Sequence, residues 1–109
     1  MEDITELEAE RTSLYQELSQ TGDLRRGTIT ATYRRCGKAN CACANPEHPG
    51  HGPRYMLTRT MAGKTRAIHL RLGPELRKAE REIENYYKFN SLVHRNVDLN
   101  EKILYRPAT

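Results

Sequence analysis

The chain has 109 residues and a net charge of +4, which allows one small domain whose hydrophobic core is marginal. It opens on the acidic, polar run MEDITELEAE, and no stretch is long and apolar enough to span a membrane. We therefore expect no secretory signal, no membrane contact and a cytoplasmic location. The charge is uneven, because residues 1–23 carry −6, residues 24–72 carry +9 and residues 73–109 carry +1.

The first predicted element is a helix over residues 3–20, within a segment 1–22. Gly22 is the residue expected to end the helix at its C-terminus. Asp3 is the expected N-cap, with Glu6 three residues later as in a capping box. Residues on one face follow each other at steps of 3 and 4, as in a coiled-coil seam with one charged interruption. These are Ile4, Leu7, Arg11, Leu14 and Leu18.

Three strands are predicted within residues 24–72. Residues 26–35 alternate between threonines and apolar or aromatic side chains, which is typical of a strand. Two further alternating runs, about 54–60 and 64–71, flank a short turn at Gly63 and indicate a hairpin. Together the three runs predict an antiparallel meander. Three strands are close to the minimum that a sheet needs to be stable on its own.

A long helix is predicted over residues 73–106, since Pro74 suits a first helical position and Pro107 ends the pattern. Its predicted seam is Leu76, Ala79, Ile83, Tyr86, Asn90, Val93, Val97, Asn100 and Leu104. Both helices adjoin the strands in sequence, so we expect them to pair as an antiparallel stalk. The predicted fold is α+β, a single domain 1–109 with a stalk helix 1–22, a basic head 24–72 and a long stalk helix 73–106.

The difference in helix length predicts that about residues 93–106 extend past the first helix. Along this extension lie Val93, Val97, Leu99, Ile103 and Leu104, with Asn90 and Asn100 on the seam. Exposed apolar stripes of this kind seek a partner. We therefore expect a homodimer, or a complex with a partner protein, through the C-terminal helix. The alternative is a helix end that frays or folds back on the sheet.

All three cysteines and two of the four histidines lie in residues 36–53, CGKANCACANPEHPGHGP. Glycines and prolines make this a turn-rich loop, and in a reducing cytoplasm such a cluster favours metal binding. The predicted cofactor is one structural Zn²⁺ per chain, bound by Cys36, Cys41, Cys43 and either His51 or His48. Three alternatives are less favoured. The segment is too polar for three buried free thiols, and a disulfide would leave one cysteine over. A catalytic Cys/His pair would have no aspartate to orient the histidine.

The runs RRCGKANCACA, HGPRYMLTR and GKTRAIHL, followed by a long helix, resemble an uncharacterised prokaryotic family catalogued as a domain of unknown function. The resemblance covers roughly residues 26–105 and implies an association with mobile genetic elements. By position, the family core falls on Cys36, Gly37, Lys38, Cys41, Cys43, His51, Gly52, Pro53 and Tyr55. The resemblance thus favours His51 over His48 as the fourth ligand, and it implies no activity.

Two functions fit the residues. In the first, the chain is a small zinc-containing protein whose basic head binds the phosphates of a nucleic acid, with DNA favoured over RNA. The alternative is a coiled-coil assembly or adaptor module that binds itself or a partner protein. No paired carboxylates, phosphate-binding glycine loop or Ser/His/Asp set is present, so we expect no enzyme and no small-molecule substrate. The predicted phosphate contacts are Arg25, Arg26, Arg34, Arg35, Lys38, Arg54, Arg59, Lys64, Arg66 and Arg71.

Overall fold

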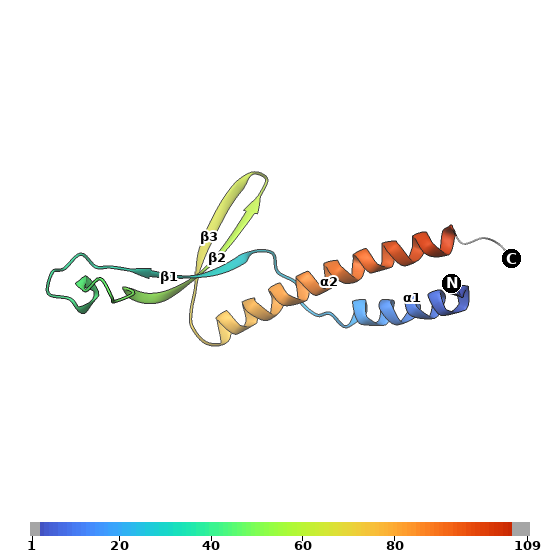
Figure 1. Ribbon diagram of the computed structural model, residues 1–109, viewed down its shortest axis with the longest axis horizontal. Coiled ribbons are helices and arrows are strands. Elements are labelled where there is room, and N and C mark those ends of the chain that lie inside the picture. Colours follow the sequence, from blue (N-terminus) through green and yellow to red (C-terminus); the bar gives the residue numbers. More distant parts are fainter. Residues whose placement is uncertain (1–2, 106–109) are drawn as a thin grey trace. The chain divides into compact units, whose positions relative to one another are not determined.

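The computed structural model describes residues 3–105, and its elements confirm the predicted α+β class (Figure 1). Contacts divide the chain into two compact units, a helical unit of residues 3–25 with 82–105 and a sheet unit of residues 26–81. No helix in the described part of the chain is long and apolar enough to cross a membrane. The elements are α1 (Ile4–Ser19), β1 (Thr28–Arg34), η1 (Ala42–Ala44), β2 (His51–Met61), β3 (Lys64–Leu70) and α2 (Pro74–Leu104).

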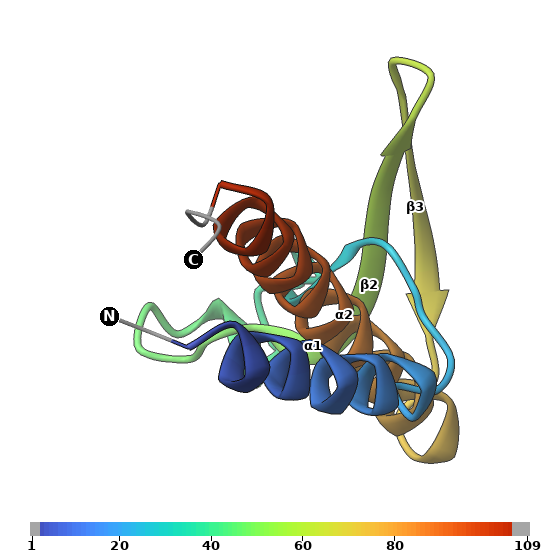
Figure 2. The same cartoon turned by 90° about the vertical axis from the view of Figure 1, so that its right-hand side faces the viewer.

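In the helical unit, α1 and α2 run side by side in opposite directions (Figures 1 and 2). The direction follows from the contacts, because Arg11 lies near Asn100 whereas Asp23 lies near Asn85. Asp3 stands at the N-cap of α1, as predicted, but its side chain makes no capping hydrogen bond. The core between the helices consists of Leu7, Leu14, Leu92 and Leu99, with Leu18 and Ile103 packed against it.

The predicted seam of α2 is wrong in its second half by one residue. Leu92 and Leu99 are buried, whereas Val93 is 38 % exposed and Leu104 is 75 % exposed. Both rows of residues satisfy steps of 3 and 4, and neighbouring positions on a helix differ by only about 100° in direction. Spacing therefore could not choose between the rows, and the packing of the larger leucines against α1 did.

The predicted extension of residues 93–106 beyond α1 is also wrong, since Leu99 and Ile103 pack against α1. Arg106 lies outside the described residues. The prediction assumed that both helices begin at the same point of the sheet. Instead the connection after α1 runs along α2, where the Asn85 amide donates to the Asp23 carbonyl and Arg25 pairs with Glu82. This connection offsets α1 toward the C-terminal end of α2.

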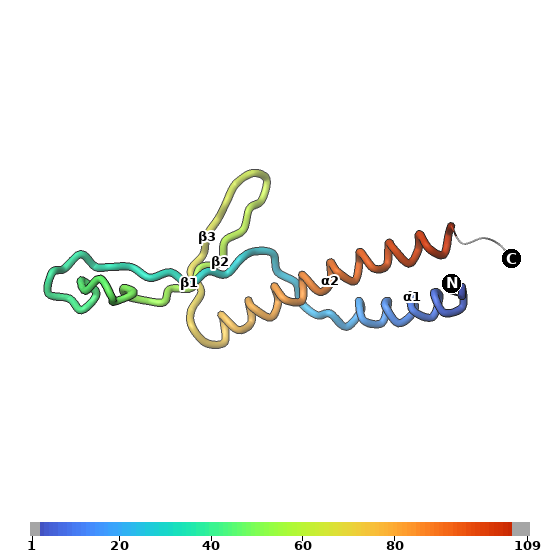
Figure 3. The backbone as a smooth tube through the Cα atoms, in the orientation of Figure 1, coloured from blue at the N-terminus to red at the C-terminus, as the bar shows by residue number. Residues whose placement is uncertain are grey.

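The sheet unit contains the predicted antiparallel meander in the order β1-β2-β3. β2 starts at His51, three residues earlier than predicted, because Arg34 and His51 are still paired across β1 and β2. At the other end, the pairing of β1 with β2 stops at Thr28 and Thr58. The hairpin of β2 and β3 therefore continues as a two-stranded ribbon beyond β1 (Figures 1 and 3). The buried apolar residues of this unit include Cys43, Leu57, Leu70, Leu76 and Ala79.

A two-residue turn, Ala62-Gly63, joins β2 to β3 with φ of 51° and 77°. Positive φ at both central residues is the type I′ geometry, which favours Asn-Gly and costs an alanine about 1–2 kcal/mol. We therefore expect Ala62→Asn to raise the free energy of unfolding by about 0.5–1 kcal/mol, measured by thermal denaturation. Gly63→Ala is the opposing control and should destabilise the protein; a neutral result for both would contradict this account of the turn.

Candidate metal centre

The loop between β1 and β2 folds through a chain of tight turns that bring its cysteines together. Gly37 has a φ of +80°, a conformation that favours glycine, directly after Cys36. The Cys41 amide then donates to the Lys38 carbonyl, and the Ala44 amide donates to the Cys41 carbonyl in η1. Figure 3 shows the chain turning in this region before it returns as β2.

The four residues Cys36, Cys41, Cys43 and His51 form one cluster, and their ligand atoms all lie within 4.8 Å of one another. The Sγ atoms of Cys36 and Cys43 are 3.5 Å apart, and Cys41 Sγ is 3.2 Å from His51 Nε2. In a tetrahedral zinc site with Zn–S bonds near 2.3 Å, neighbouring sulfurs are about 3.8 Å apart. The donor set and its spacing therefore fit a zinc ion, with four protein ligands and no open position.

Two glycines allow the backbone on both sides of His51 to approach β1. A Cβ on Gly50 would lie 3.1 Å from the backbone of Arg34, and a Cβ on Gly52 would lie 2.7 Å from the Thr32 carbonyl oxygen. Both glycines also have positive φ, +104° and +145°. The close approach holds the imidazole of His51 beside the cysteines, so these glycines position the histidine of the cluster.

His48, the alternative ligand, lies outside the four-residue cluster. Its Nδ1 atom accepts a hydrogen bond from the Gly50 amide at 3.0 Å, and its own amide donates to the Asn45 carbonyl. His48 thus stabilises the turn that leads into β2. The geometry favours His51 as the fourth ligand, in agreement with the family resemblance.

The guanidinium of Arg35 connects the parts of the loop to one another. Its Nη1 donates to the carbonyl oxygens of Cys43 and Asn45, and its Nη2 donates to those of Pro46 and His48. A Cys₃His zinc site carries a net charge near −1, which the guanidinium also offsets. Arg35 therefore stabilises residues 43–48 of the loop through hydrogen bonds to their carbonyl oxygens.

The thiols are not equivalent. The Lys38 amide, followed by His51 and Cys43, lowers the pKa of Cys36 to about 6 from an ordinary 9.0. At Cys43, a hydrogen bond from the Cys36 amide acts to lower the pKa, but burial and the neighbouring Cys36 and Cys41 thiols outweigh it and raise the pKa. These contacts favour the thiolate of Cys36, the form that binds metals.

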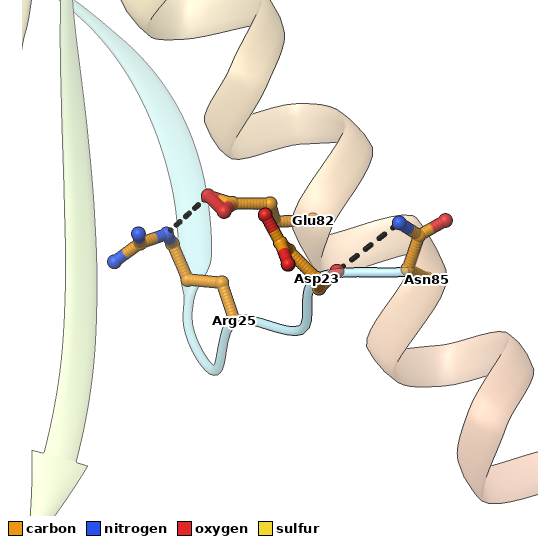
Figure 4. Close-up of polar contacts among 4 residues, drawn as sticks. All are labelled: Asp23, Arg25, Glu82 and Asn85. Carbon is orange, nitrogen blue, oxygen red and sulfur yellow. Dashed lines mark hydrogen bonds and ion pairs between the residues drawn. The ribbon is translucent and has the colours of Figure 1, made fainter. Parts of the chain in front are cut away.

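The predicted basic residues fall into three groups. Arg25 belongs to the helical unit and pairs with Glu82 there (Figure 4). Arg34, Arg35 and Arg54 meet at the metal cluster, where they line an open pocket of about 350 Å³ with Cys36, His51 and Gly52. The remaining residues lie elsewhere in the sheet unit, with Arg26 before β1, Lys38 in the loop, Arg59 in β2, Lys64 and Arg66 in β3, and Arg71 after β3.

The sequence analysis missed the hydrogen bonds that Arg35 makes around the cluster. These guanidinium contacts depend on the path of residues 42–48, which no short pattern predicts. The only available signal was the density of glycine and proline around His51, which indicated tight turns without naming their partners.

Comparison with known proteins gives a family for this chain. No curated protein and no solved structure matches the chain. A family model matches residues 4–85, which includes α1, the whole sheet unit with its Cys/His cluster, and the start of α2. The match begins and ends earlier than the resemblance inferred from the sequence, and it covers most of the chain. The chain therefore belongs to the family described as Domain of unknown function (DUF6788).

Proposed function

We propose that this protein binds one structural zinc ion through Cys36, Cys41, Cys43 and His51, and that its sheet unit binds nucleic acid through the phosphates. The observation that supports nucleic-acid binding best is the pocket beside the metal cluster. Arg34 and Arg54 line it, and neither of them forms a side-chain ion pair within residues 3–105. Guanidinium groups gathered in an open pocket suit a phosphate, which they bind by paired hydrogen bonds.

The separation of charge between the units supports the same proposal. The sheet unit, residues 26–81, contains twelve lysines and arginines against three acidic residues, a net charge of +9. The rest of the chain carries −5. A strongly basic surface on one unit attracts polyanions and accelerates their association, and phosphate contacts dominate the affinity of such proteins for nucleic acids.

In this proposal zinc is structural and the protein is not an enzyme. A Cys₃His set fills the tetrahedron, whereas catalytic zinc keeps one position open for water or substrate. The ion would hold β1, the loop and the start of β2 in one arrangement and so fix Arg34 and Arg54 beside each other. A role near mobile genetic elements, which the family resemblance implies, remains a prediction.

The test is fluorescence anisotropy with a short labelled DNA duplex over a range of salt concentrations. We expect the protein to bind DNA at low salt. The logarithm of the binding constant should fall with the logarithm of the salt concentration, with a slope of about 0.9 per phosphate contacted. The double variant Arg34→Gln with Arg54→Gln should weaken binding about tenfold or more and reduce that slope by about 1–2. Arg35 is left unchanged because it supports the loop.

The matched control is Arg77→Gln with Arg81→Gln, which removes the same charge from exposed positions on α2 within the same unit. It should weaken binding by less than the Arg34 and Arg54 variant does. Equal weakening would mean that net charge alone matters, and wild-type protein without affinity for DNA or RNA at low salt would contradict the proposal.

Self-association through α2 is a second candidate, favoured by Val93, Val97 and Leu104, which share one helix face and are 38 %, 50 % and 75 % exposed. A second copy of the chain could cover this face, as in the predicted homodimer. Light scattering on the wild type and on Val97→Glu, with Glu101→Lys as an exposed control on the same helix, tests it. We expect a wild-type dimer that Val97→Glu dissociates; a monomeric wild type would contradict the candidate.

A further inference from the structure

The end of the β2–β3 hairpin is a two-stranded ribbon with solvent on both faces. Pairing with β1 stops at Thr58, so Arg59–Met61 and Lys64–Arg66 pair only with each other (Figure 1). Every residue from 59 to 69 is exposed. This segment, which we call the ribbon tip (residues 59–66), buries no side chain of the core.

One face of the ribbon tip concentrates positive charge. Arg59 lies directly opposite Arg66, and Met61 lies directly opposite Lys64. Because alternate residues of a strand share a face, these four side chains lie on the same side of the ribbon. They line an open pocket of about 260 Å³. Like charges directly opposite each other destabilise a strand pair, so the fold gains nothing from this arrangement.

The nearby sequence offers no compensation for these charges. Two of the three acidic residues of the sheet unit are placed elsewhere, since Glu47 lies in the metal loop and Glu75 accepts a hydrogen bond from the Arg71 amide. Within residues 3–105, the side chains of Arg59, Lys64 and Arg66 form no ion pair and no hydrogen bond. The opposite face of the tip, by contrast, is stabilised by a hydrogen bond between the Thr60 and Thr65 hydroxyls.

We propose that the ribbon tip is an arm that binds duplex DNA, with Arg59, Lys64 and Arg66 around one backbone phosphate. This inference rests on the proposed function and identifies the duplex as its partner. A two-stranded ribbon fits the major groove of B-form DNA, which is about 12 Å wide. The major groove of A-form RNA is deep and narrow, so the same ribbon suits duplex RNA poorly.

The arrangement makes a prediction that a purely structural role would not make. Removing the paired arginines should weaken ligand binding and at the same time stabilise the free protein. We expect Arg59→Gln with Arg66→Gln to weaken duplex DNA binding about tenfold and to raise the melting temperature of the free protein by about 2 °C. Inorganic pyrophosphate should raise the melting temperature of the wild type by more than that of this variant, in which only the pocket of Arg34 and Arg54 is left to bind it.

The control is again Arg77→Gln with Arg81→Gln, which removes the same charge and leaves the ribbon tip intact. It should keep the pyrophosphate response and most of the DNA affinity. Duplex RNA of matched sequence, tested at the same salt, should bind the wild type more weakly than duplex DNA does.

The outcomes separate this inference from the proposed function. If the tip variant binds DNA as well as the control does, or if duplex RNA binds as tightly as DNA, the inference is overturned and the proposed function stands. If the wild type binds no nucleic acid, both are overturned, even if pyrophosphate still stabilises it through the tip.

Discussion

Cys41→Ser is expected to purify with far less zinc than the wild type, which should contain about one ion per chain, the stoichiometry of a single four-ligand site. The ligand atoms of the cluster lie within 4.8 Å of one another, so each of them is needed to complete the tetrahedron. Substitution of a residue that only hydrogen-bonds to a metal ligand already lowers metal affinity about 10–100-fold, so the loss of a ligand itself should lower it further. The measurement is metal analysis of protein purified without a histidine tag.

The same substitution should destabilise the sheet unit. Zinc binding contributes folding free energy to small domains, and residues 35–50 contain only the three residues of η1 as regular structure. We expect Cys41→Ser, or the wild type in a strong chelator, to unfold at much lower temperature than the zinc-bound wild type. A wild type that contains no metal and keeps its stability in chelator would contradict the zinc site.

A matched pair of histidine variants identifies the fourth ligand. His51→Gln should lose zinc because His51 Nε2 belongs to the cluster. His48→Gln should retain zinc with a smaller loss of stability, since it removes only the hydrogen bond from the Gly50 amide. The reverse result would assign the ligand to His48.

Arg25→Met is expected to destabilise the helical unit by about 2–3 kcal/mol, because it removes a charged partner from a buried carboxylate. Glu82 is only 5 % exposed, and its Oε1 accepts a hydrogen bond from Arg25 Nε at 3.0 Å (Figure 4). The Arg25 amide also donates to the Glu82 carbonyl, so the ion pair fixes the connection after α1 at one position along α2. Urea denaturation followed by circular dichroism measures the loss.

The control for Arg25 is an exposed ion pair of the same unit. Arg95 and Glu10 are 3.6 Å apart, and about half of each side chain is exposed, 52 % and 47 %. Such pairs contribute little, so Arg95→Met should cost less than about 0.5 kcal/mol. The double variant Arg25→Met with Glu82→Met should recover most of the stability, since apolar residues can replace a buried pair. Equal losses for Arg25→Met and Arg95→Met would contradict the argument.

Local sequence patterns are enough to predict the helices, the strands and most of the candidate ligand set. Period-two alternation predicted all three strands, and the seam of Leu7, Leu14 and Leu18 in the first helix is the one that packs in the structure. The three cysteines lie so close together in sequence that their tight loop alone brings them near one another. Local patterns suffice in these cases because the interactions concerned join residues that are near in sequence.

The tertiary structure is needed to establish which residues meet across long sequence separations. It chose Leu92, Leu99 and Ile103 over the adjacent row of α2, and the Arg25–Glu82 pair offset α1 along that helix. It placed His51, and not His48, in the cluster because the pairing of Arg34 with His51 brings the imidazole back to the cysteines. It also placed Arg59 opposite Arg66. Spacing specifies a face or a loop, whereas register and helix offset depend on packing between distant segments, which the pattern of one segment does not contain.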